Sequence, residues 1–125
     1  MIERNGSIWE TDAKIIGHGV NTQGLMGAGI AVQFKDKFPD NYHFYRDQCT
    51  AGHLKPGDFA GYLENEKIIM NFASQRNPGK DARYDWLFNS LFAGAAMWSN
   101  ASEDLKGKYG TVIAIPEIGC GIGET

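Results

Sequence analysis

Residues 18–29 place polar side chains among glycines in a stretch that has almost no charge. His18, Asn21 and Gln23 stand close together, and imidazole and amide groups of this kind hydrogen-bond a sugar or polarise a water molecule. The unperturbed pKa of histidine lies near neutral pH, so His18 could orient a water or protonate a leaving oxygen. The alternative is a histidine that is hydrogen-bonded inside a structural turn.

The flanking residues indicate how this stretch is held. An apolar run at 13–16 ends at Gly17 and predicts a buried strand. From Ile30 to Phe38 the apolar residues recur at helical spacing, and Pro39 ends the run. A strand, a glycine-rich turn and a helix start bring backbone N–H groups to the positive end of a helix dipole, where phosphate or another anion binds.

The glycine spacing excludes a Walker-type nucleotide loop. Neither GxxxxGK[ST] nor GxGxxG occurs in this stretch, where the glycines run GLMGAG. A plain tight turn is the alternative to an anion-binding loop.

Composition predicts one ordinary globular domain. The chain has 125 residues, of which 42% are hydrophobic, enough for a single core. Its formal charge of −3 argues against broad polynucleotide binding, which needs a basic surface, so an anionic ligand would be held by backbone N–H groups. Cys49 and Cys120 lack metal-ligand spacing and indicate a reducing cytosol. With no signal peptide, transmembrane run or metal cluster visible, we expect a cytoplasmic protein without a cofactor, a metal or a membrane partner.

Alternating strand and helix patterns predict an α/β sandwich, in which ligand sites lie at the carboxyl ends of the strands. Residues 59–63 and 67–72 are expected to form a hairpin. Asp40 is the expected N-cap of the next helix. The stretch 85–98 predicts a helix with a wide apolar face, which belongs to the core.

Three smaller expectations complete the element pattern. Phe88 and Phe92 extend the apolar stripe of the helix at 85–98 and are expected in the core. Residues 99–108 read as a polar connection, and 111–115 (TVIAI) as a buried strand.

The polar stretch 71–84 (NFASQRNPGKDARY) is too long for a plain connection, and loops of this length are often functional. Arg76, Lys80 and Arg83 put local positive charge on this stretch, beside a site that would take an anion. A solvated surface loop is the alternative.

Two stretches resemble a known family. HGVNTQGLMGAGIAVQFKDKFP, residues 18–39, resembles the first ligand loop of macro domains, in the branch that includes ADP-ribose 1″-phosphate phosphatases and phage-encoded relatives. IPEIGCGIG, residues 115–123, resembles the second phosphate loop of that family. The resemblance implies a single macro domain over residues 1–125, a three-layer sandwich with a central mixed sheet between helices. Macro domains usually continue with one more helix and a terminal strand, which are not expected before Thr125.

The resemblance implies ADP-ribose as the ligand, and it implies contacts with four groups of residues. Those of the first loop are Asn21, Gln23, Gly27, Ala28, Gly29, Ile30 and Ala31. Those of the second loop, over the diphosphate and distal ribose, are Gly119, Cys120, Gly121, Ile122 and Gly123. Ser74, Gln75 and Tyr84 would line the distal-ribose side. Ser7 stands where macro domains usually carry an acidic residue that meets the adenine amino group, and Ile8 would pack against the base.

The resemblance also implies an activity. In the phosphatase branch the histidine that matches His18 is implicated in removing the 1″-phosphate. Glycohydrolase branches use a lysine after the strand that contains Asn71 and an acidic residue in the second loop, and the matching positions are Gln75 and Gly123. We therefore expect a phosphatase of ADP-ribose 1″-phosphate. The alternatives are a non-catalytic ADP-ribose reader and a hydrolase that removes ADP-ribose from modified macromolecules, the one setting in which nucleic acid is expected as a partner.

Overall fold

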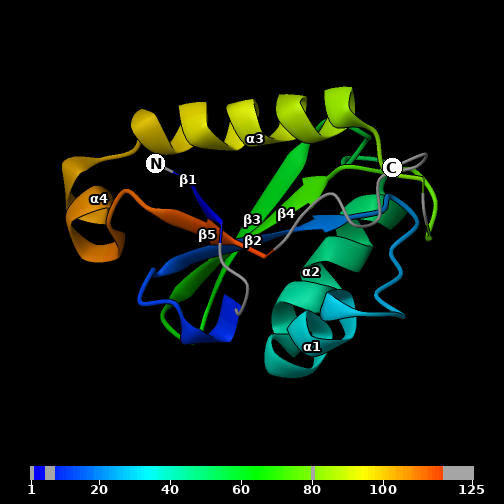
Figure 1. The fold of residues 1–125 in the computed structure, drawn as a ribbon, viewed down its shortest axis with the longest axis horizontal. Coiled ribbons are helices and arrows are strands. Elements are labelled where there is room, and N and C mark those ends of the chain that lie inside the picture. The colour runs from blue at the N-terminus through cyan, green and yellow to red at the C-terminus, as the bar shows by residue number, and fades with distance from the viewer. Residues whose placement is uncertain (1, 5–7, 80, 117–125) are drawn as a thin grey trace.

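A five-stranded mixed sheet forms the middle of the protein (Figure 1). The computed structural model describes residues 2–4, 8–79 and 81–116. The strand order is β1-β5-β2-β4-β3, with β1 (Ile2–Arg4), β5 (Ile113–Ile115), β2 (Ile15–Val20), β4 (Lys67–Ala73) and β3 (Phe59–Glu64). Neighbouring strands pair in parallel except β3, which runs antiparallel to β4. The predicted hairpin and the predicted mixed sheet are confirmed.

Helices cover both faces of this sheet, as the expected sandwich requires. Helix α3 (Tyr84–Ser99) lies over one face, with α4 (Glu103–Tyr109) following it, and α1 (Ile30–Lys37) and α2 (Pro39–Thr50) lie over the other (Figure 1). Because successive strand residues point to opposite faces, Ile15 packs in the cluster on the α3 side and Ile16 in the cluster that includes Phe34 of α1. A short 3-10 helix, Ile8–Glu10, precedes β2.

Strand β2 is longer than its sequence predicted. It continues through Gly17, His18 and Gly19 to Val20 and pairs with β4 along its whole length. The prediction that the strand ends at Gly17 is wrong because the two glycines serve close packing here. A Cβ on Gly17 would lie 2.5 Å from a ring carbon of Phe72, and one on Gly19 would lie 2.7 Å from the hydroxyl of Ser74.

Helix α2 is capped from a distant strand. Its N-cap residue is Phe38, which is followed by Pro39 at the first helical position. The carboxylate of Glu64, at the end of β3, accepts hydrogen bonds from the backbone N–H groups of Asp40 at 3.3 Å and Asn41 at 2.7 Å. The prediction that Asp40 caps this helix is therefore wrong, because Glu64 satisfies the N–H groups that a local cap would take.

Two expectations about the chain after residue 84 are also wrong. Phe88 and Phe92 lie on the outer face of α3, with 52% and 72% of their surface exposed. Residues 99–108 are not a plain connection, because most of them form α4, whose N-cap Ser102 accepts a hydrogen bond from the N–H of Leu105.

In the described part of the chain, no helix has the length and apolar character that crossing a bilayer requires.

Candidate ligand site

The loops that follow β2 and β4 lie side by side at the carboxyl ends of these strands. The pairing of Val20 with Ala73 brings the two strand ends together. Beyond them, the backbone N–H and the hydroxyl of Thr22 both donate to the carbonyl of Arg76, each at 3.2 Å. Two stretches that are distant in sequence are thereby joined at the edge of the sheet where an α/β sandwich binds its ligands.

Asn21 holds the first loop in shape. Its side-chain oxygen accepts hydrogen bonds from the N–H groups of Gln23 at 2.9 Å and Leu25 at 3.4 Å, and its side-chain nitrogen donates to the Leu25 carbonyl at 2.8 Å. The hydroxyl of Tyr45 lies 2.6 Å from the Asn21 carbonyl oxygen, and burial raises the pKa of this hydroxyl, so it stays a donor. The Asn21 amide is committed to the loop, and its contact with a ribose stays a prediction.

The first loop ends in an open helix N-terminus. Gly29 is the N-cap of α1, with φ +60° and ψ −140°, a conformation that is almost restricted to glycine. Within the described part of the chain, no side chain caps this end, and the first turn of α1 has no acidic residue. Gly27, Ala28 and Gly29 are exposed, and Ile30 and Ala31 are half-buried. Free N–H groups and the helix dipole make this end suitable for an anion.

Hydrogen bonds within the β4–α3 loop fix its backbone. The side-chain nitrogen of Gln75 donates to the carbonyls of Asn77 at 2.6 Å and Gly79 at 2.8 Å. The carboxylate of Asp81 accepts from the N–H groups of Asn77 at 2.9 Å and Arg76 at 3.1 Å, and the Asn77 bond contributes most to lowering the pKa of Asp81. Gln75 therefore shapes the loop that surrounds it.

The remaining predicted residues of this side lie at the start of α3. Ser74 is buried, and its carbonyl accepts a hydrogen bond from the N–H of Arg83 at 3.0 Å. The Tyr84 side chain, 54% exposed, stacks on Phe88 with ring centroids 6.2 Å apart. Gln23 is exposed and its side-chain nitrogen lies 3.5 Å from the side-chain oxygen of Asn77. The structure thus gathers Gln23, Ser74 and Tyr84 at one edge.

His18 lies within strand β2 and not in the loop. Its side chain is 0% exposed and stacks on Phe34, with ring centroids 3.8 Å apart. Its Nε2 lies 3.0 Å from the Asn71 side-chain oxygen. The Asn71 side-chain nitrogen donates to the carbonyl of Ala60 and to Asn41, which fixes the orientation of the Asn71 amide. The oxygen is then an acceptor, so Nε2 of His18 must carry the proton.

This hydrogen-bond pattern leaves Nδ1 as the second nitrogen of the His18 ring. Nδ1 is buried and has no hydrogen-bond partner in the described structure. Burial lowers the pKa of His18 from 6.5 to about 4, so the ring is neutral at pH 7. The catalytic role of His18 stays a prediction, and this geometry favours a histidine that is hydrogen-bonded inside the fold.

Several predicted contacts lie outside this edge or outside the described residues. Ile8 has 2% of its surface exposed and packs with Ile16 and Phe34 in the core, so a base would reach it only after other atoms moved. Ser7 and the second loop (Gly119, Cys120, Gly121, Ile122 and Gly123) lie outside the described residues. Among the residues that are described, no group of three or more His, Cys, Asp and Glu could hold a metal ion.

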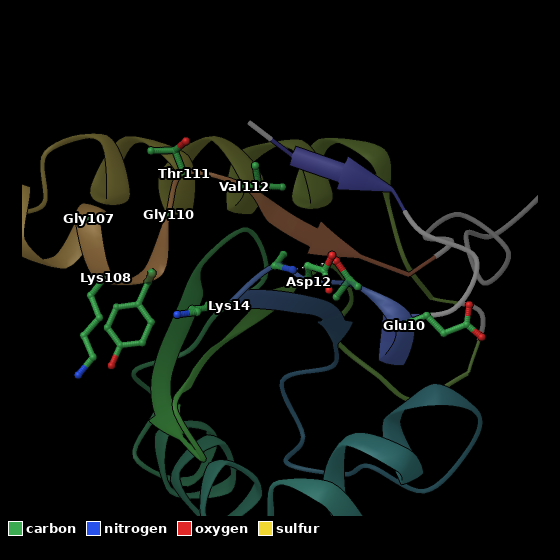
Figure 2. Close-up of a pocket in the computed structure, with 11 residues that line it drawn as sticks. Glu10, Asp12, Lys14, Gly107, Lys108, Gly110, Thr111 and Val112 are labelled. Carbon is green, nitrogen blue, oxygen red and sulfur yellow. Dashed lines mark hydrogen bonds between the residues drawn. The ribbon is translucent and has the colours of Figure 1, made fainter.

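A pocket of about 620 Å³ lies away from this edge, where β2 and β5 begin (Figure 2). Residues 10–14 and 107–112 line it, with Glu10 and Lys108 toward its two ends. None of the predicted ligand residues that the structure describes lines it. The sequence carried no signal for this pocket, because its walls are the amino-terminal ends of strands and a helix end.

Solved structures share the fold. The macrodomain of Thermus aquaticus DarG superposes with a TM-score of 0.74 at 22% identity, covering 94% of this chain and 98% of that one. Thermosipho africanus DarTG in complex with ADP-ribose has a TM-score of 0.79 at 23% identity, covering 96% of this chain and 33% of that one. The chain has the macro-domain fold. The three-layer sandwich predicted from the two glycine-rich stretches is thereby confirmed, whereas its assignment to the phage-type branch stays a prediction.

Sequence relatives of this chain carry names of two activities. No protein-family model matches the chain. The DNA ADP-ribosyl glycohydrolase of Thermus aquaticus is 32% identical over 90 residues, which make up 69% of this chain and 25% of the relative. The ADP-ribose 1″-phosphate phosphatase of Meyerozyma guilliermondii is 32% identical over 71 residues, 57% of this chain and 38% of the relative. The chain therefore spans between 25% and 38% of these curated relatives' length.

Proposed function

We propose that this macro domain binds ADP-ribose at the carboxyl edge of its sheet and hydrolyses the phosphate monoester of ADP-ribose 1″-phosphate. The observation that carries the proposal is the N-terminus of α1, which follows Gly29 at φ +60° and is capped by no side chain of the described residues. Backbone N–H groups at such an end hold a phosphate without needing a basic side chain, which suits a chain with a formal charge of −3. The ADP-ribose complex of a protein with the same fold supports this ligand.

The two joined loops provide the walls of the proposed site. Gly27 to Ala31 would lie beside the diphosphate, and Ser74, Gln75 and Tyr84 would lie on the distal-ribose side. The residues of the second loop, 119–123, would cover the diphosphate. The name of the Meyerozyma guilliermondii relative supports the phosphatase activity.

The tautomer of His18 limits what this residue can do in such a reaction. Nε2 donates to Asn71, so a proton could be accepted only at Nδ1, and His18 would act by orienting or deprotonating a water. A base whose pKa is lowered to about 4 contributes little at neutral pH. Most of the rate enhancement in this proposal therefore comes from positioning the phosphate and the water.

Removal of ADP-ribose from a macromolecule is the second candidate, because the relatives in Thermus aquaticus and Mycobacterium tuberculosis are named DNA ADP-ribosyl glycohydrolases. Gln75 argues against a covalent version of this chemistry. Its carboxamide has no nucleophilic lone pair, and its nitrogen already donates to two loop carbonyls.

Three measurements on the purified protein separate the candidates. Calorimetric titration with ADP-ribose tests binding, and release of inorganic phosphate from ADP-ribose 1″-phosphate tests the phosphatase. Binding with phosphate release supports the proposal, whereas binding without release identifies a reader. Release of ADP-ribose from ADP-ribosylated DNA would favour the second candidate, and absence of ADP-ribose binding would refute all three.

A further inference from the structure

Two guanidinium groups lie over one indole ring beside the proposed site. The guanidinium carbon of Arg83 is 4.5 Å from the centroid of the Trp86 ring, and that of Arg76 is 5.6 Å from it. Both arginines are exposed, and Trp86 is half-buried in the first turn of α3. Stacking on an aromatic face is favourable for a guanidinium and limits the positions it takes. The loop thus presents two guanidinium groups whose positions are restrained before any ligand binds.

The backbone bonds of these arginines place them at the carboxyl edge of the sheet. Arg83 donates its N–H to the carbonyl of Ser74, and Arg76 accepts from Thr22 through its own carbonyl. One arginine is therefore bonded to the end of β4 and the other to the first loop. Both belong to the side that the proposed function assigns to the distal ribose.

Carboxylates in the neighbourhood leave the two guanidinium groups available. Asp81 interacts electrostatically with both arginines, but one of its oxygens, Oδ2, is held by the backbone N–H groups of Arg76 and Asn77. Asp85 is exposed in the first turn of α3. Among the described residues, neither Arg76 nor Arg83 forms an ion pair with a carboxylate. Their N–H donors can therefore bind an anionic ligand.

The charge of the proposed substrate requires such donors. Its 1″-phosphate is a monoester that adds a charge of about −1.5 to −2 at pH 7, beyond that of the diphosphate. A helix N-terminus offers only about half a positive charge, and the chain as a whole is negative. Guanidinium groups bind phosphate through paired, charge-assisted hydrogen bonds.

We infer that Arg76 and Arg83, restrained on Trp86, bind the terminal phosphate monoester and make the site prefer ADP-ribose 1″-phosphate over ADP-ribose. The inference rests on the proposed function for the class of ligand. It goes further by assigning the discrimination between the two nucleotides to these side chains. The sequence of residues 71–84 shows the two arginines, but only the fold shows that their guanidinium groups lie over the Trp86 ring.

The test compares two ligands on matched variants. Arg76→Gln, Arg83→Gln and the double variant each remove positive charge and leave the backbone hydrogen bonds in place. Lys108→Gln is the control, because Lys108 also lies over an aromatic ring, 5.4 Å from the centroid of Tyr109, and lines the pocket where β2 and β5 begin. The Kd for ADP-ribose is measured by calorimetry. For ADP-ribose 1″-phosphate, kcat/KM is measured by phosphate release, or the Kd where the protein does not turn it over.

Each arginine variant is expected to weaken recognition of the phosphorylated ligand about tenfold, the range for a hydrogen bond to a charged group. The double variant loses more, while the Kd for ADP-ribose stays within about twofold of wild type, since its diphosphate is held by backbone N–H groups. Lys108→Gln changes neither value.

Three outcomes would overturn the inference. Equal losses for both ligands would show that the arginines act on the whole loop. A wild-type protein that binds both ligands with the same affinity would remove the preference that they are meant to explain. A wild-type protein that binds neither nucleotide would refute the proposed function and this inference together.

Discussion

Replacing Gly29 with valine tests whether the N-terminus of α1 is the anion site. Gly29 has φ +60° and ψ −140°, and a Cβ built on it meets no atom of the described residues within 4 Å. In the free protein the substitution therefore acts through backbone strain and not through a clash of its Cβ with those residues. Gly110 is a matched control, with φ +81° and ψ −170° and equally open space, at the C-cap of α4 beside the pocket where β5 begins.

The expected size of the strain is the same at both positions. A non-glycine residue in this region costs about 1–3 kcal/mol, which lowers the melting temperature by roughly 4 °C per kcal/mol in a domain of this size. Gly29→Val and Gly110→Val should therefore show similar losses in thermal unfolding. Only Gly29→Val should lose ADP-ribose binding in calorimetry below the melting temperature, because a relaxed loop no longer aims its N–H groups at the ligand and a side chain blocks the approach.

Two results would refute this reasoning. If Gly29→Val binds ADP-ribose with wild-type affinity, the diphosphate lies elsewhere. If Gly110→Val loses binding to the same extent, the effect follows from lost stability and says nothing about the first loop.

Three further predictions follow from the structure. Burial lowers the pKa of His18 from 6.5 to about 4. The free energy of unfolding should therefore be at its full value above pH 6.5 and should fall by roughly 3 kcal/mol as the pH falls toward 4, because only the unfolded state binds the proton in that range. Urea unfolding at a series of pH values should show a weaker pH dependence of this free energy for His18→Gln. Borohydride should trap no ADP-ribosyl adduct on the protein, and Gln75→Lys should not create one because Gly123 offers no acid–base group; an adduct on the wild type would contradict the residue assignment. Gly17→Ala should cost about 1–3 kcal/mol through the clash with a β4 phenylalanine ring 2.5 Å away, whereas Gly107→Ala, in open space on α4, should be neutral or stabilising in the same assay.

The sequence alone was sufficient to predict the elements that are set by residues close together along the chain. The hairpin at 59–72 was predictable because its strands are bounded by turn residues, and its two-residue turn at Asn65 and Glu66 takes positive φ values of 52° and 59°. The start of α1 at Ile30 followed from helical spacing after a glycine. These features depend on residues that are close together along the chain.

Elements that depend on distant partners were not predictable in this way. Strand β2 continues through two glycines because β4 supplies the pairing and because Phe72 needs the space beside Gly17. The cap of α2 comes from Glu64, more than twenty residues away. In the sequence of α3, a residue at the edge of the buried face has the same apolar spacing as a residue just outside that face. The angle at which the helix packs on the sheet therefore decided that Phe92 is exposed.

The same distinction between local and distant interactions applies to the candidate site. The residue types and their spacing by themselves predicted an anion-binding turn within residues 18–39, which stays a prediction, and determined that Gln75 cannot act as a nucleophilic lysine. Only the tertiary structure decided that Asn21 is committed to the loop through Tyr45, and that His18 is a neutral, buried imidazole. The physical reason is that a side chain's type is fixed by its own atoms, whereas its hydrogen-bond partners and its access to water come from segments that only folding brings together.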